Sequence, residues 1–279
     1  MIKNFLILLL TVIFFFNSLL STATVQAKTI ENPPHKIIFS NKITVNTLFY
    51  PYRDAPHTPT LKAKGLQGLT IDQKNNYYLT YATGDKNRYG YIYKYSSKGK
   101  VLKKSNKQLI GHGQAISYMD GFLYQLADIR GNKQYKLQKI DPHTLKSIRN
   151  WTIPAEIHPN VIAMLDDQTV AAVSKTATGY EINKIHLTSK QNATRDWREK
   201  IVVTGLIGTT ADHVVQGFAY GNGRYYILSN GQYMTITKTG KSKKIIHLNT
   251  KREPEGIAIN QQGKIIISFN KLNEIFIQK

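Results

Sequence analysis

The sequence predicts an all-β protein, a five-bladed β-propeller whose last blade is closed by an N-terminal strand. One short pattern recurs five times, at intervals of roughly 40 to 55 residues, which is a spacing typical of propeller blades. Each copy has a polar amide or carboxylate, a small or β-branched residue, an apolar residue, a small residue and another apolar residue. The copies are Gln67–Ile71, Gln114–Tyr118, Asn160–Met164, Gln216–Tyr220 and Glu255–Ile259.

Further strands are predicted after each copy. A short polar turn leads to a second run of β-branched and aromatic residues, which together are typical of a hairpin. The second runs are Tyr77–Tyr81, Phe122–Leu126, Thr169–Val173, Tyr225–Leu228 and Ile265–Phe269. A third strand follows in each unit and a fourth can be traced in most, which indicates four-stranded antiparallel blades. An irregular β-sandwich remains the alternative.

The two ends of the pattern predict how the ring closes. The fifth unit reaches Lys279 after only its third strand, whereas a free strand pattern, His35–Ser40, precedes the first unit. We expect His35–Ser40 to supply the missing outer strand of the last blade. Residues 41–63 would then form a long loop leading into the first blade, because this segment contains Pro51, Pro56 and Pro59.

Residues 1–27 have the features of a cleavable secretory signal peptide. Lys3 precedes an apolar run, Phe5–Phe16, which has the length of a signal h-region and is short for a membrane span. Val25 and Ala27 are small residues that suit signal peptidase, so we expect cleavage after Ala27. Residues 28–279 would then be a single secreted, extracellular domain with no transmembrane segment. An uncleaved N-terminal anchor is the alternative.

The composition is strongly basic and contains no cysteine. The chain has 38 Lys and Arg against 17 Asp and Glu, a formal net charge of +21. Outside a cell this charge favours anionic partners such as teichoic acids or acidic polysaccharides, although a solvated lysine-rich surface explains it equally well. The lack of cysteine excludes disulfides and thiol chemistry. We expect a monomer with no cofactor and no specific nucleic-acid partner.

Two sets of polar residues are candidates for a ligand site. The residues that open the repeats would form a ring at one mouth of the channel, where they could bind sugars, water or a cation, or could instead fix the strands. They are Gln67, Gln114, Asn160, Gln216 and Glu255. The second set stands two or three positions upstream in four blades and would cluster at the same mouth of the channel. It consists of His112, His158, His213 and Glu253.

The second set could hold a metal or perform acid–base chemistry, together with the neighbouring Asp212 and Arg252. The spacing contains no local metal signature, so the sequence leaves the question of a metal open. Five-bladed glycosidases place carboxylates from different blades around the centre. Here Asp212, Glu253 and Glu255 all come from the last two blades, which is a poor geometry for flanking one glycosidic bond. We therefore predict binding rather than catalysis, with a glycan-active enzyme as the alternative.

Several stretches carry a resemblance to a known family. They are Gln67–Ile71, Gly111–Tyr118, Glu253–Ile257, Ile265–Phe269 and Asn273–Phe276. With these stretches the chain resembles the helveticin-J-type class III bacteriocins, secreted propeller proteins of Gram-positive bacteria. The resemblance implies an antibacterial protein that acts at the surface of related bacteria, with anionic cell-wall polymer or glycan as its ligand. It implies no catalytic residue, and some family members lack the signal peptide that this chain is predicted to carry.

Overall fold

The structure is a computed structural model that describes residues 34–51, 65–83, 88–129, 134–195, 197–209, 213–241, 243–270 and 272–279. The predicted signal peptide and Asp212 lie outside the described residues. Pro34–Lys279 forms one compact unit, in which the described helices are two short 3-10 turns, η1 (Ala155–Ile157) and η2 (Trp197–Glu199). None of the described helices is long and apolar enough to cross a membrane.

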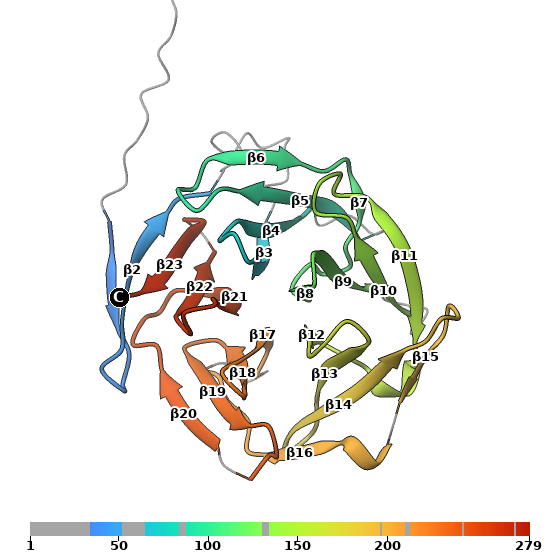
Figure 1. Ribbon diagram of the computed structural model, residues 1–279. Coiled ribbons are helices and arrows are strands. Elements are labelled where there is room, and N and C mark those ends of the chain that lie inside the picture. Colours follow the sequence, from blue (N-terminus) through green and yellow to red (C-terminus); the bar gives the residue numbers. More distant parts are fainter. Residues whose placement is uncertain are drawn as a thin grey trace, which may run out of the picture. The chain divides into compact units, whose positions relative to one another are not determined.

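The prediction of a five-bladed β-propeller is confirmed, because five antiparallel sheets surround a central axis (Figure 1). Blade 1 contains β3 (Gly65–Ile71), β4 (Tyr77–Ala82), β5 (Tyr89–Tyr95), β6 (Val101–Lys104) and β7 (Gln108–Leu109). Blade 2 contains β8 (Ile116–Met119), β9 (Phe122–Ile129), β10 (Gln134–Ile140) and β11 (Ser147–Ile153). Blade 3 contains β12 (Val161–Met164), β13 (Thr169–Lys175), β14 (Gly179–Leu187), β15 (Ala193–Arg195) and β16 (Ile201–Thr204).

Blade 4 contains β17 (Val215–Gly221), β18 (Arg224–Ser229), β19 (Gln232–Thr237) and β20 (Lys243–His247). Blade 5 contains β21 (Pro254–Ile259), β22 (Ile265–Phe269) and β23 (Glu274–Gln278), together with the N-terminal strands β1 (Lys36–Ile38) and β2 (Thr44–Phe49). The innermost strands are therefore β3, β8, β12, β17 and β21, which begin at or next to the repeated pattern.

The hydrophobic core lies between neighbouring blades. Second strands such as β22 are buried along their whole length because both faces pack against adjacent blades, whereas the outer strand β6 is exposed throughout. Apolar clusters join each blade to the next around the whole ring. One cluster unites blades 2, 3 and 4, and the others join blades 4 and 5, 5 and 1, and 1 and 2. Each interface thus depends on its neighbours, which makes closure of the ring important for stability.

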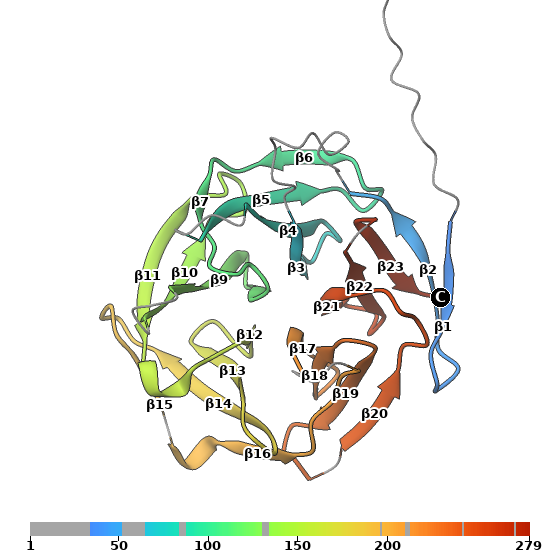
Figure 2. The same ribbon diagram turned by 180° about the vertical axis from the view of Figure 1, so that it is seen from behind.

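An N-terminal strand closes the ring, as predicted, but it is not the strand that the sequence indicated. β2 pairs with β23 and so becomes the fourth strand of blade 5, while β1 pairs with β2 and forms an additional outermost strand (Figure 2). Thr44–Phe49 was predicted as part of the loop, and this prediction is wrong. Val45 and Phe49 are buried in the core, and the first proline of the segment predicted as a loop is Pro51, two residues after the strand ends. Residues 52–64 lie outside the described part of the chain.

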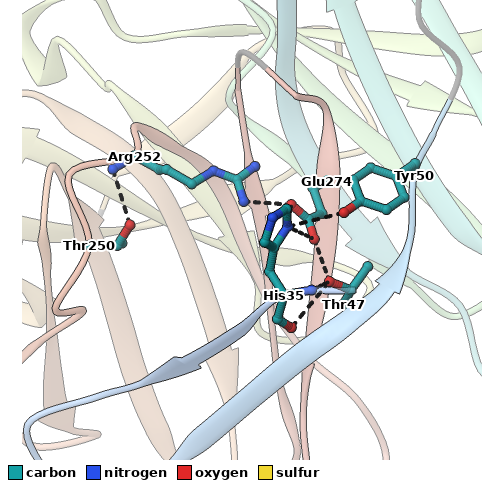
Figure 3. A network of polar contacts seen from close by, with 6 residues as sticks. All are labelled: His35, Thr47, Tyr50, Thr250, Arg252 and Glu274. Atoms are coloured by element: carbon teal, nitrogen blue, oxygen red, sulfur yellow. Dashed lines mark hydrogen bonds and ion pairs between the residues drawn. The ribbon is translucent and has the colours of Figure 1, made fainter. Parts of the chain in front are cut away.

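A buried carboxylate fastens these N-terminal strands to the last blade (Figure 3). Glu274 opens β23, and its side chain is 0 % exposed. It accepts hydrogen bonds from the Thr47 hydroxyl in β2 and from Arg252 Nη1 at 2.5 Å. His35 Nδ1 lies 3.0 Å from Glu274 Oε1 and 3.1 Å from the Tyr50 hydroxyl. We call these five residues the closure network, because they connect the two ends of the described chain.

Glycine stands at the second position in three of the five repeat copies, at Gly68, Gly217 and Gly256, and permits close packing of the inner strands. A Cβ atom on Gly256 would lie 2.8 Å from the Cβ and backbone nitrogen of Leu69 in the neighbouring blade. A Cβ on Gly68 would lie 2.4 Å from the carbonyl oxygen of Gly113. These contacts are shorter than real Cβ atoms tolerate. Glycine at these positions therefore allows the inner strands of neighbouring blades to approach each other closely at the centre of the ring.

We expect Gly256→Ala to destabilise the protein by about 1–3 kcal/mol, because the new methyl group overpacks a rigid backbone contact. Gly65→Ala is the matched control, since its Cβ would meet only the flexible Gln67 amide, at 3.1 Å. Denaturant unfolding of both variants gives the comparison. If Gly256→Ala were as stable as the control, the close approach of these strands would not limit the fold.

Candidate functional site

Polar side chains from three blades meet where the inner strands begin, at one mouth of the channel. Gln114 donates a hydrogen bond from Nε2 to Gln216 Oε1. Gln216 Nε2 lies 3.1 Å from Asn230 Oδ1 and 3.2 Å from Glu253 Oε1. Gln114 belongs to blade 2 and Gln216 to blade 4, so their bond crosses the channel mouth past blade 3. Of the residues predicted for the site, the structure thus brings Gln114, Gln216 and Glu253 together.

Glu255 completes this group, which we call the mouth cluster: Gln114, Gln216, Asn230, Glu253, Glu255 and Asn270. Glu255 is only 3 % exposed, and its Oε1 accepts a hydrogen bond from Asn270 Nδ2 at 3.0 Å. Burial and the negative charge of Glu253 raise the pKa of Glu255 to about 9, against a smaller lowering by hydrogen bonds from Asn270 and Gln114. Glu255 is thus a neutral carboxylic acid at pH 7, able to donate as well as accept.

Gln67 lies at the same mouth, beside blade 2. A Cβ atom on Gly113 would stand 3.0 Å from Gln67 Cβ, which places the glutamine side chain against the segment that leads to Gln114. Its Oε1 is buried and accepts no hydrogen bond from the described residues. A buried acceptor without a donor is unfavourable, so a water or a ligand hydroxyl that enters the mouth would stabilise this group.

Asn160 does not join the mouth cluster, although the repeat places it in register. Its side chain is exposed, and its Oδ1 accepts a hydrogen bond from the backbone nitrogen of Lys175 at 3.0 Å. This contact fixes the start of β12 to the end of β13. Asn160 therefore fixes neighbouring strands, which was one of the two roles that the sequence allowed for the residues that open the repeats.

The three histidines contact separate partners. His112 Nδ1 lies 3.3 Å from Arg88 Nη1, and His158 Nδ1 lies 3.3 Å from the Tyr135 hydroxyl. His213 Nδ1 lies 3.1 Å from the backbone carbonyl oxygen of Ile207. Within the ranges that the structure describes, no group of three or more His, Asp or Glu side chains could hold a metal ion.

Arg252 also departs from the sequence-based expectation. The sequence grouped it with the mouth residues, but its guanidinium binds Glu274 in the closure network and packs near Phe269, 5.1 Å from the ring centroid. Asn230 and Asn270, in contrast, were not predicted as site residues. Each directly follows the second strand of its blade, so aligning the ends of β18 and β22 would have revealed them.

The fold is similar to those of solved propellers of low sequence identity. A gluconolactonase from Xanthomonas campestris has a TM-score of 0.47 and 11% identity, over 88% of this chain and 94% of that one. A glucose dehydrogenase has a TM-score of 0.45 and 10% identity, over 88% of this chain and 99% of that one. No protein-family model matches the sequence, and no curated protein is significantly similar to it. The comparisons concern the five-bladed fold alone.

Proposed function

We propose that this protein is a secreted binding propeller that recognises glycan of the bacterial cell surface at the channel mouth. The observation that supports this proposal most directly is the mouth cluster, in which amides and a neutral carboxylic acid lie together at the start of the inner strands. Sugar hydroxyls both donate and accept hydrogen bonds, and these side chains offer both functions. Gln67 Oε1, a buried atom that accepts no hydrogen bond from the described residues, adds an acceptor at the same mouth.

The net charge of +21 would strengthen attachment to anionic cell-wall polymers over the rest of the surface. This contribution weakens with salt, because mobile ions screen exposed charges, whereas hydrogen bonds at the mouth are less affected. A helveticin-like bacteriocin is the most specific form of the proposal. Growth inhibition of Gram-positive strains by the purified protein tests that form, and a negative result over a broad panel would reject it while leaving glycan binding intact.

We expect Gln114→Ala and Asn270→Ala each to weaken binding to purified Gram-positive cell walls about tenfold at high salt, since each loses a hydrogen bond to the mouth cluster. Cosedimentation with the walls measures this effect. His158→Ala is the control, because His158 is exposed and contacts Tyr135 instead of the cluster. Equal binding by all four proteins would contradict recognition at the mouth.

One observation favours a glycan-active enzyme as a second candidate. Glu255 retains its proton at pH 7 beside Glu253, and a protonated acid next to a carboxylate is the pair that glycoside hydrolysis uses. The release of reducing ends from cell-wall glycan tests this alternative. Hydrolysis that is abolished by Glu255→Gln and by Glu253→Gln would support the enzyme, and activity that survives both substitutions would exclude this pair.

A further inference from the structure

A second candidate site, separate from the mouth cluster, lies between blades 4 and 5. It is a pocket of about 440 Å³, and its lining includes Asn41, Arg224, Tyr226, Tyr233, Lys244 and Gln278. We call it the blade 4–5 pocket. Its volume is within the range of small-molecule sites and is sufficient for one or two sugar rings.

The strand register places one end of this pocket, at Arg224 and Gly263, at the opposite end of the inner strands from the mouth cluster. Gln216 stands near the start of β17, whereas Arg224 pairs with Gly221 at the end of that strand. Gly263, which also lines the pocket, lies in the turn after β21, the strand in which Glu255 stands near the beginning. About five residues of extended strand, roughly 16 Å, therefore separate this end of the pocket from the mouth cluster.

The pocket combines aromatic rings with positive charge. Tyr226 is 7 % exposed and Tyr233 is 1 % exposed, and their ring centroids are 6.4 Å apart. Arg224 and Lys244 are exposed at its edge, and the lining contains no carboxylate. In the described part of the chain, no side-chain hydrogen bond or ion pair engages either cation. Two cations without a counter-charge favour a ligand with an anionic group, and the volume of the pocket leaves space for a sugar ring beside that group.

Amide groups complete the lining. Asn41 Nδ2 lies 3.5 Å from the Tyr233 hydroxyl, and Gln278 Oε1 accepts a hydrogen bond from the Ile265 backbone nitrogen at 3.1 Å. The Gln278 amide nitrogen thus keeps its hydrogens for another acceptor. Asn41 comes from the turn between β1 and β2, so the pocket is complete only when the N-terminal strands are docked.

We propose that the blade 4–5 pocket binds an anionic saccharide, a sugar that carries a phosphate or a carboxylate group. The guanidinium of Arg224 can form paired hydrogen bonds with either group, and the ammonium of Lys244 adds a second charge. Tyr226 and Tyr233 are 7 % and 1 % exposed and form the floor of the pocket, while Thr235 and Gln278 in its lining offer polar groups to the sugar hydroxyls. This inference goes beyond the proposed function, because it concerns a separate site and does not depend on binding at the mouth.

Isothermal titration calorimetry of the whole protein with four probes tests the proposal: glucose 1-phosphate, glucuronic acid, glucose and inorganic phosphate. We expect at least one charged sugar to bind about tenfold or more tightly than glucose and inorganic phosphate. The preferred charged sugar identifies phosphate or carboxylate as the group recognised. Binding of inorganic phosphate as tight as that of glucose 1-phosphate would overturn recognition of the sugar, and a lack of binding by all four probes would overturn the site.

Arg224→Ala and Lys244→Ala should each weaken binding of the charged sugar about tenfold, and both are exposed, so the fold should be retained. Lys103→Ala is the matched control, because it removes the same charge from a different pocket, between blades 1 and 2, whose lining has no aromatic ring. Gln114→Ala separates the two sites, since it should affect the mouth alone. If Lys103→Ala lowered the affinity for the charged sugar as much as Arg224→Ala does, the binding would depend only on the net charge of the protein, and the proposal would be refuted.

Discussion

Replacing Glu274 with glutamine should destabilise the propeller by on the order of 3 kcal/mol, because it removes the buried negative charge that three parts of the chain share. Thr47 and His35 hold β2 and the start of β1 to this carboxylate, and Arg252 holds the segment before β21. A glutamine side chain has one acceptor oxygen in place of two and leaves the Arg252 guanidinium without its counter-charge. The N-terminal strands should therefore separate from β23 before the other blades unfold.

The pH dependence of this effect has a definite sign. Burial raises the pKa of Glu274, but hydrogen bonds from Thr47, Arg252 and His35 lower it by more, so the net pKa lies below its ordinary value of 4.5. A carboxyl group whose pKa is lowered by folding contributes stability at pH values above the unfolded-state pKa. That contribution disappears as the pH falls through the pKa of the folded state. The difference in the free energy of unfolding between wild type and Glu274→Gln should thus have its full value at pH 7 and should decrease below about pH 4.5.

Urea unfolding at neutral and acidic pH measures the size of the effect, and hydrogen exchange of the β2 amides shows where the structure opens first. Glu199→Gln is the control, because Glu199 forms a partly exposed ion pair with Lys184 at 3.2 Å, and a surface pair of this type contributes less than about 1 kcal/mol. If Glu274→Gln and Glu199→Gln had equal effects, the closure network would not be what keeps the ring closed.

The blades could be predicted from sequence because their signals are local. Alternating apolar residues and polar turns recur in each unit, and each hairpin forms between neighbours in the chain. The closing strand could not be assigned in the same way. Both His35–Ser40 and Thr44–Phe49 have strand character, and only pairing with β23, more than two hundred residues away, determines which of them becomes the fourth strand. The prolines after Thr44–Phe49 further concealed it within an apparent loop.

The candidate site was predictable where the position of a residue at the start of an inner strand determines its place. Gln114, Gln216 and Glu255 hold equivalent positions at the start of inner strands, and a propeller brings such positions together. The directions of loop side chains follow from local backbone geometry instead. His158 and His213 have left-handed φ angles of 46° and 44°, which the sequence pattern did not reveal. The blade 4–5 pocket was not predicted because its residues come from distant segments with no shared motif.

A second large effect should appear at Glu255, where glutamine is expected to stabilise the protein. Folding raises the pKa of Glu255 from 4.5 to about 9, chiefly through burial and then through Glu253. Between these values the folded state retains a proton that the unfolded state releases. The stability of the wild type should therefore fall as the pH rises through this window, by at most about 1.4 kcal/mol per pH unit.

Glutamine resembles the protonated acid and does not titrate, so Glu255→Gln should lack this slope. Wild type and variant should be similar near pH 4.5, and the variant should be more stable by on the order of 3 kcal/mol at pH 7. Urea unfolding across this pH range provides the measurement. Glu253→Gln serves as a companion variant, which should flatten the slope only in part because burial, the larger cause, remains. A wild-type stability that does not change across this pH range would contradict a raised pKa at Glu255.

The same substitution separates a structural role of Glu255 from a functional one. A residue that only supports the fold should not lower the stability of the protein at neutral pH. Glu255, in contrast, is expected to lower it. Residues that lower stability in this way are typical of binding and catalytic sites, where a residue can be required for function although it destabilises the fold. If the mouth binds glycan, Glu255→Gln should therefore be more stable than wild type and yet differ from it in cell-wall binding. Greater stability with unchanged binding would place glycan recognition outside the mouth cluster.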